Sequence, residues 1–157
     1  MAGDAPVATV PSAVADLPFD RSVGFGVRAL NRAIQRSLGG AIGAHGATLG
    51  TWYFLRVLWE RDGRTQRELA DAVGMMEPTA AAALREMEAA GWITRTRDAE
   101  DRRKQIVVLT AAGRALRETL LPEAHAVNAR ATAGFSEAER ETLLALLARA
   151  LSNLDRP

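Results

Sequence analysis

The sequence predicts a mainly helical fold that carries one small β-hairpin. Apolar residues recur at helical spacing over most of the chain. Two capping-box motifs, Thr65 to Glu68 and Ser136 to Glu139, mark the starts of helices. A single pair of β-rich runs, at 92–97 and 105–110, is joined by a short charged loop, which is typical of a hairpin. The 157 residues, 48% of them hydrophobic, suffice for one domain with a real core.

Composition excludes several classes of site. The sequence contains no cysteine and only two histidines, so thiol chemistry, disulfides and Cys-containing zinc sites are excluded, and we expect no metal and no cofactor. The net charge of +1 means that any basic surface must be local. Residues 1–17 lack periodicity and the features of a signal peptide, and we expect a mobile tail there. With no apolar run long enough to span a bilayer, we expect a cytoplasmic protein without a membrane partner.

The first two helices are predicted from their apolar patterns. A stripe begins at Phe19 and repeats every three or four residues to Leu38, after which Gly39, Gly40 and Gly43 are expected to end or loosen the helix. A second helix, capped by Thr48, ends at the turn formed by Asp62 and Gly63. It is apolar almost all round, which indicates a central position.

A helix-turn-helix motif follows. The capping box at Thr65 starts a short helix that ends near Val73, and Gly74 permits a tight turn. The next helix begins near Pro78 and stops at Gly91, just before the hairpin. This order, a winged helix-turn-helix, places its second helix in a DNA major groove and its hairpin on the flanking backbone or minor groove.

Two more helices complete the chain. Thr110 caps the first of them, and Pro122 is expected to kink it. The last begins at Ser136, and its leucines at 143, 147, 151 and 154 fall on one face.

A local basic cluster favours double-stranded DNA as the partner. Five cations lie within the ten residues of 95–104. In the second helix of the motif, Thr79 is followed by four alanines, which donate no hydrogen bond, so we expect a bare outward face and a large share of backbone and shape recognition. The predicted DNA-binding residues are Arg64, Gln66, Arg67, Thr79, Ala81, Ala82, Arg85, Arg95, Arg97, Arg102, Arg103 and Lys104.

The segment TQRELADAVGMMEPTAAAALREMEAAGWITR followed by DRRKQIVVLTAAG resembles the MarR family of bacterial regulators, and the likeness extends from Phe19 to the C-terminus. It implies one domain over 18–157, with dimerisation helices at 18–47 and 111–157 and the winged helix-turn-helix at 48–110. It also implies a homodimer on a pseudo-palindromic operator, and a repressor, since many proteins of the family repress transcription. The residues expected at the dimer interface are Phe19, Val23, Leu143, Leu147, Leu151 and Leu154.

The stretch HGATLGTWYFLRVLWERDG resembles the branch of that family that governs aromatic-compound catabolism. This likeness implies an effector that is a small aromatic acid or its CoA thioester. Arginine suits the carboxylate of such a ligand and tryptophan suits its ring, although aromatic residues at helical spacing are more often core. The predicted ligand-binding residues are Arg28, Asn31, Arg32, His45, Trp52, Tyr53 and Arg56.

Two other classes of function agree less well with the sequence. An enzyme is disfavoured because the sequence has no phosphate-binding glycine loop, nucleophile elbow or zinc-protease motif. A winged helix that docks on another protein has no need of five clustered cations. We therefore expect a DNA-binding regulator that is not an enzyme.

Overall fold

The computed structural model describes residues 16–102 and 104–155, and the chain divides into two compact units, 1–33 and 34–157. The predicted tail falls almost wholly outside the described residues. In the first unit, a 3-10 turn at Phe19–Arg21 precedes the start of helix α1 (Val23–Gly43). The rings of Phe19 and Phe25 lie 5.0 Å apart there.

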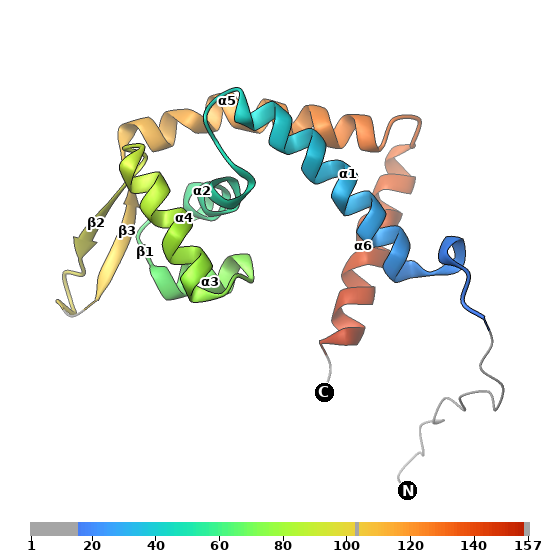
Figure 1. Ribbon diagram of the computed structural model, residues 1–157, viewed down its shortest axis with the longest axis horizontal. Helices are drawn as coiled ribbons and strands as arrows, with labels where there is room; N and C mark the ends of the chain where they lie inside the picture. Colours follow the sequence, from blue (N-terminus) through green and yellow to red (C-terminus); the bar gives the residue numbers. More distant parts are fainter. Residues whose placement is uncertain (1–15, 103, 156–157) are drawn as a thin grey trace, which may run out of the picture. The chain divides into compact units, whose positions relative to one another are not determined.

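The second unit contains the rest of α1 and all other elements, and it confirms a mainly helical fold with a small sheet (Figure 1). Its elements are α2 (Leu49–Glu60), β1 (Arg64–Thr65), α3 (Gln66–Val73), α4 (Glu77–Ala89), β2 (Ile93–Arg97), β3 (Gln105–Leu109), α5 (Ala111–Ala131) and α6 (Glu137–Leu154).

The first helix begins at Val23 instead of Phe19. It continues through Gly39 and Gly40 and ends at Gly43, the last of the three glycines that were predicted to end or loosen it. Glycine in a helix interior costs only about 1 kcal/mol relative to alanine, and buried residues on both sides of the pair hold the helix in place. These residues are Leu38 and Ile42.

Helix α2 occupies the centre of the second unit, as its all-round apolar pattern predicts. It begins at a reciprocal cap, in which the Thr48 hydroxyl accepts from the Thr51 amide and the Thr51 hydroxyl accepts from the Thr48 amide. Its residues Phe54, Leu55 and Leu58 are fully buried. Helices α3, α4 and α5 all contact it, and Figure 1 shows it nearly end-on beneath α5.

The wing is a three-stranded antiparallel sheet in the order β1-β3-β2, whereas the sequence predicted two strands. The additional strand β1 is only two residues long and pairs Arg64 with Val107. A strand this short shows no alternation of apolar and polar residues by which it could be predicted. Strands β2 and β3 pair from Ile93 with Leu109 outward to Arg97 with Gln105. Figure 1 shows this hairpin extending away from the helices.

The turn between α3 and α4 depends on Gly74, whose φ of 68° is left-handed and favours glycine. The next amide, of Met75, donates to the Ala70 carbonyl at 2.9 Å. The sharp turn aims the N-terminal end of α4 outward.

Helix α5 is joined closely to the helix-turn-helix at its first turn. A Cβ on Gly113 would lie 2.0 Å from the carbonyl oxygen of Trp92, so only glycine fits. The Trp59 indole donates to the Gly113 carbonyl at 2.9 Å. The helix continues across Pro122 to Ala131. None of the helices in the described ranges is both long enough and apolar enough to cross a membrane.

Candidate DNA interface and ligand cavity

Two of the four consecutive alanines of α4 lie on its accessible face. Ala80 and Ala83 are buried in the core, because they share the inward face with Leu84 and Met87 at helical spacing. Only Ala82 is exposed, while Ala81 is half-buried. The two alanines predicted to contact DNA, Ala81 and Ala82, are therefore the two that remain accessible in the run. The predicted DNA-binding residues Thr79 and Arg85 are exposed on α4.

Met76 is a further exposed residue at the start of α4, and sequence reasoning missed it. It is the N-cap of the helix, makes no side-chain capping bond, and is 78% exposed. It precedes Thr79 by three residues, so the two share one face of the helix start. That spacing was the available signal, but the methionine type alone does not distinguish Met76 from Met75, which packs against the core.

The tip of the wing is ordered by Asp98. Its carboxylate accepts the amides of Glu100 at 2.8 Å and Asp101 at 2.9 Å, and these bonds hold its pKa below the usual value. The amide of Lys104 donates to the Asp101 carbonyl at 2.9 Å, which closes the turn. Arg97, Arg102 and Lys104 are exposed around this turn, and Arg103 lies outside the described residues.

The remaining predicted DNA-binding residues lie nearer the helices. Arg67 is exposed on α3 with its guanidinium 4.0 Å from the Asp71 carboxylate. Arg64 and Gln66 are half-buried, and the Nε of Arg64 is buried without a hydrogen-bond partner in the described structure. Arg95 is also half-buried, in contact with Glu88 and Gln66. The structure therefore separates exposed cations from cations that are held within the fold.

The residues predicted to bind a ligand are distributed over several places. Trp52, Tyr53 and Arg56 line one shallow hollow of about 310 Å³ between α2 and α3. Trp52 is itself buried, under the Arg56 guanidinium, whose carbon lies 5.5 Å from the ring centre. His45 lies elsewhere, 3.7 Å from the Glu123 carboxylate. The other three predicted residues are exposed on α1 in the first unit: Arg28, Asn31 and Arg32.

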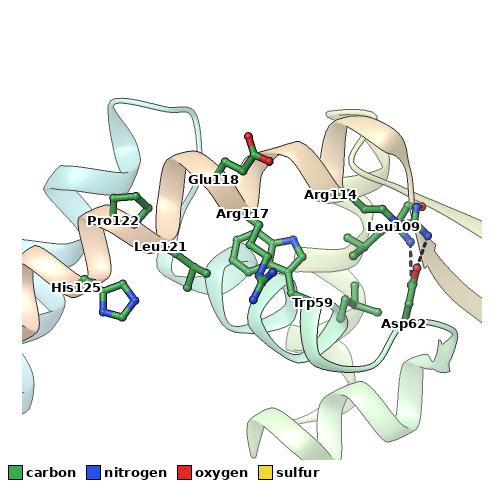
Figure 2. Close-up of a pocket in the computed structure, with 10 residues that line it drawn as sticks. Trp59, Asp62, Leu109, Arg114, Arg117, Glu118, Leu121, Pro122 and His125 are labelled. Atoms are coloured by element: carbon green, nitrogen blue, oxygen red, sulfur yellow. Dashed lines mark hydrogen bonds and ion pairs between the residues drawn. The ribbon is translucent and has the colours of Figure 1, made fainter.

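A larger cavity of about 640 Å³ opens between α2, the end of β3, and α5 (Figure 2). Sequence reasoning did not assign it, because its residues come from segments about 50 positions apart, and none belongs to the predicted ligand set. The lining residues are Leu58, Trp59, Asp62, Leu109, Arg114, Arg117, Glu118, Leu121, Pro122 and His125.

One end of this cavity is a hydrogen-bonded junction. Arg114 donates to Asp62 at 2.6 Å and to the Leu109 carbonyl at 2.7 Å. The other oxygen of Asp62 accepts the Leu109 amide at 3.0 Å. These bonds connect the end of α2, the last residue of the wing and the first turns of α5.

The middle of the cavity offers a cation beside an aromatic ring. In Figure 2, Arg117 and Leu121 project from α5 to the side on which Trp59 lies, whereas Glu118 points away. Arg117 is exposed and has no ion-pair partner among the residues that the structure describes. An unpaired guanidinium next to an indole and leucines suits a flat molecule with a negative end.

Comparison with known proteins identifies the class. The model of the MarR family matches residues 48–105. The transcriptional regulator BilQ of Clostridium symbiosum is 32% identical over 102 residues, which cover 65% of this chain and 71% of BilQ.

Solved structures agree with this result. A probable transcriptional regulator from Pseudomonas aeruginosa superposes with a TM-score of 0.77 at 33% identity, covering 85% of this chain and 99% of that one. MepR of S. aureus, solved as a complex with DNA, gives a TM-score of 0.77 at 25% identity, covering 84% and 98% of the two chains.

The fold and the exposed basic wing thus define a winged-helix transcriptional regulator that binds DNA and is not an enzyme. The chain belongs to the MarR family.

Proposed function

We propose that this regulator is a homodimeric repressor of a pseudo-palindromic operator, and that a small aromatic acid or its CoA thioester releases it from DNA. The observation that carries the ligand-responsive part is the cavity that combines an unpaired Arg117 with Trp59, next to the junction at the base of the wing.

For DNA binding, α4 enters the major groove. Thr79 and Arg85 supply polar groups to base edges or phosphates, and Ala82 and Met76 supply apolar contacts suited to a thymine methyl group. The exposed wing cations Arg97, Arg102 and Lys104 bind the flanking backbone or the adjacent minor groove.

For dimerisation, both ends of the chain carry exposed apolar side chains. In α6, Leu147, Leu151 and Leu154 are exposed, and in the first unit Phe19 and Val23 are exposed. Clusters of this kind are typical of surfaces that another molecule covers. A second copy of the chain is the proposed partner, and it also supplies the second half-site contact of a palindrome.

For the effector, the cavity volume falls in the range of small-molecule sites, roughly 300–1,000 Å³. The ligand's carboxylate pairs with Arg117 and its ring packs on Trp59 and Leu121. A carboxylate that also attracts Arg114 competes with Asp62, and so disturbs the bonds that hold Leu109 at the base of the wing. This provides a route from ligand to reduced DNA affinity.

A gel-shift titration at low and high salt, with duplex selected from a random pool by the wild-type protein, tests the DNA part. Arg102→Ala is expected to weaken binding and to lower the slope of log affinity against log salt by about 0.9, the amount for one phosphate contact. Arg149→Ala removes an exposed cation from α6 and serves as the control. If neither the wild type nor Arg102→Ala binds duplex at low salt, the DNA-binding function is contradicted. If both give the same salt slope, Arg102 does not contact a phosphate.

A thermal-shift screen of benzoic, cinnamic and hydroxycinnamic acids and their CoA thioesters tests the effector part. A compound that stabilises the wild type is expected to lose that effect in Arg117→Gln and to keep it in Tyr53→Leu, which alters the smaller hollow and not the larger cavity. The same compound should dissociate the complex with DNA. An effect that is kept in Arg117→Gln and lost in Tyr53→Leu would transfer the site to the smaller hollow.

A further inference from the structure

We propose that Arg95 is a positioning residue for DNA binding, whose guanidinium holds the wing at a fixed angle to the recognition helix α4 and does not contact a phosphate. The inference rests on the proposed DNA-binding surface. It assigns to one of the predicted DNA contacts a different role, and it makes Glu88 and Gln66 its partners.

The contacts of Arg95 set it apart from the other wing cations. Its Nε lies 3.2 Å from Oε2 of Glu88 on α4, and its Nη1 donates to Oε1 of Gln66 on α3 at 3.4 Å. Its side chain is 24% exposed. One planar guanidinium therefore joins β2, α3 and α4.

The register of the sheet explains why Arg95 points toward the helices. Arg95 pairs with Val107, and Val107 pairs in turn with Arg64 on the other edge of the sheet. Directly paired residues share a face, and Val107 is fully buried, so this row lies on the face that packs against the core. Arg97 follows two residues later on the same face but is exposed.

The physical consequence concerns the free energy of DNA binding. Recognition requires α4 and the wing to contact one duplex at the same time, and the link between them contains Gly91, whose φ is 74°. A wing that moves freely relative to α4 loses that freedom on binding, which weakens affinity. A guanidinium that is bound to both helices restricts the wing already in the free protein, so less conformational entropy is lost when DNA binds. Since the Glu88 carboxylate neutralises its charge, Arg95 also attracts a phosphate less strongly than an unpaired arginine does.

The dependence of affinity on salt separates the two roles. A lost phosphate contact lowers the salt slope by about 0.9, whereas a lost positioning contact weakens binding at every salt concentration equally. Arg95→Gln is expected to weaken binding about tenfold, the size of a coupling between bonded neighbours, with the wild-type slope. Arg97→Gln, the matched control on the same strand face, is expected to lower the slope. A slope for Arg95→Gln that falls as in Arg97→Gln overturns the proposal.

Glu88 gives a second, opposite prediction. If Arg95 binds phosphate, removing the neighbouring carboxylate strengthens DNA binding, as removing any nearby negative charge does. If Arg95 positions the wing, Glu88→Gln weakens binding, and the double variant with Arg95→Gln is no weaker than Arg95→Gln alone. Glu86→Gln, the same change at an exposed position of α4, is the control. Equal affinity of Glu88→Gln and Glu86→Gln overturns the proposal.

The mobility of the wing is measurable without DNA. The chain has no cysteine, so Ala99→Cys, at the exposed wing tip, accepts a single nitroxide or fluorescent label. Both Arg95→Gln and Glu88→Gln are expected to increase the mobility of the label, whereas Arg97→Gln leaves it unchanged. Unchanged mobility in the first two variants overturns the proposal. Failure of the wild type to bind duplex in a salt-dependent way would contradict DNA binding itself, a result distinguishable from all of these.

Discussion

Helices α2 and α6 are both rich in apolar residues, yet they have opposite surroundings. In α2, five residues are buried, and α3, α4 and α5 contact it from different sides. In α6, no residue is buried, and Leu151 and Leu154 are 62% and 84% exposed. An apolar pattern therefore indicates that a helix face is buried against something. Whether that is the rest of the same chain or another molecule depends on the tertiary structure.

The second unit therefore has two regions that differ in the burial of their apolar side chains. The closely packed region buries them within the chain, and α6, the incomplete region, leaves them exposed. The region of α2, α3, α4 and the sheet buries its own apolar side chains, so its stability depends on internal packing. The leucines of α6 gain the same burial only when another molecule covers them. Variants that affect one region and leave the other intact test this difference.

The largest expected effect is in the closely packed region. Gly113→Ala places a Cβ 2.0 Å from the Trp92 carbonyl oxygen and should lower the free energy of unfolding by about 3 kcal/mol or more. The control is Gly40→Ala in α1, where the added Cβ meets nothing within 4 Å and helix propensity predicts a gain of about 0.5–1 kcal/mol. Chemical denaturation measures both. A tolerated alanine at position 113 would show that α5 can move away from the wing at little cost.

The next effect concerns the incomplete region. Leu147→Asp or Leu151→Asp should raise the dimer dissociation constant by about a hundredfold or more, because a charge replaces an apolar side chain at the proposed interface. Circular dichroism should be unchanged, since neither leucine belongs to the core. Arg149→Asp, on the opposite side of α6, is the control. A stable dimer in light scattering with either leucine variant would remove α6 from the interface.

A smaller effect is expected at the bond between α2 and α5. Trp59→Phe keeps an aromatic ring but removes the donor to the Gly113 carbonyl, and should cost about 1 kcal/mol of stability. Tyr53→Phe, on the same helix, removes a polar group with no hydrogen-bond partner in the described structure and should cost less than about 0.5 kcal/mol. Thermal unfolding distinguishes them. Equal losses would mean that the indole bond contributes nothing beyond ring packing.

The smallest effect compares the two capping boxes that contain a glutamate, one in each region. Hydrogen bonds from Thr65 hold the pKa of Glu68 below its usual value, and bonds from Ser136 do the same for Glu139. A lowered pKa stabilises the fold above the unfolded-state value of 4.5, and this stabilisation is lost as pH falls through the folded-state pKa.

Glu68→Gln should therefore be less stable than the wild type by about 0.5 kcal/mol at pH 7, with a gap that shrinks below pH 4.5. Glu139→Gln should also be less stable than the wild type, and the loss should appear as fraying of the first turn of α6. Urea titrations at pH 7 and pH 3.5 measure the gap. A gap that widens in acid would contradict the assigned bonds.

Local signals in the sequence predicted the elements well. The caps at Thr48, Thr65 and Ser136 were confirmed, because a capping bond joins residues only three apart. The same holds for the glycine turn at Gly74 and for the central position of α2. Of the three glycines predicted to end or loosen α1, Gly43 ends it, whereas Gly39 and Gly40 stay helical because burial of Leu38 and Ile42, a tertiary effect, outweighs their low helix propensity.

The candidate sites were predicted less completely. The exposed wing cations Arg97, Arg102 and Lys104 follow from the local charge cluster. The larger cavity does not, because Trp59, Leu109 and Arg117 meet only after α2, β3 and α5 have packed together. Sequence analysis therefore selected Trp52 and Arg56 on the same helix. Both line a different hollow, although Arg56 also borders a small one with Trp59 and Arg117.

The order of the helices, the hairpin, the family and the segments rich in charged or apolar residues can be predicted from the sequence, since all of these depend on residues close together in the chain. Which arginines are exposed to a partner and which are held inside depends on how the elements pack. Arg95 and Arg97 are two residues apart on one strand face, and no sequence pattern separates them. The positions of Glu88 and Gln66 on two packed helices do, because charge pairing depends on distance in space.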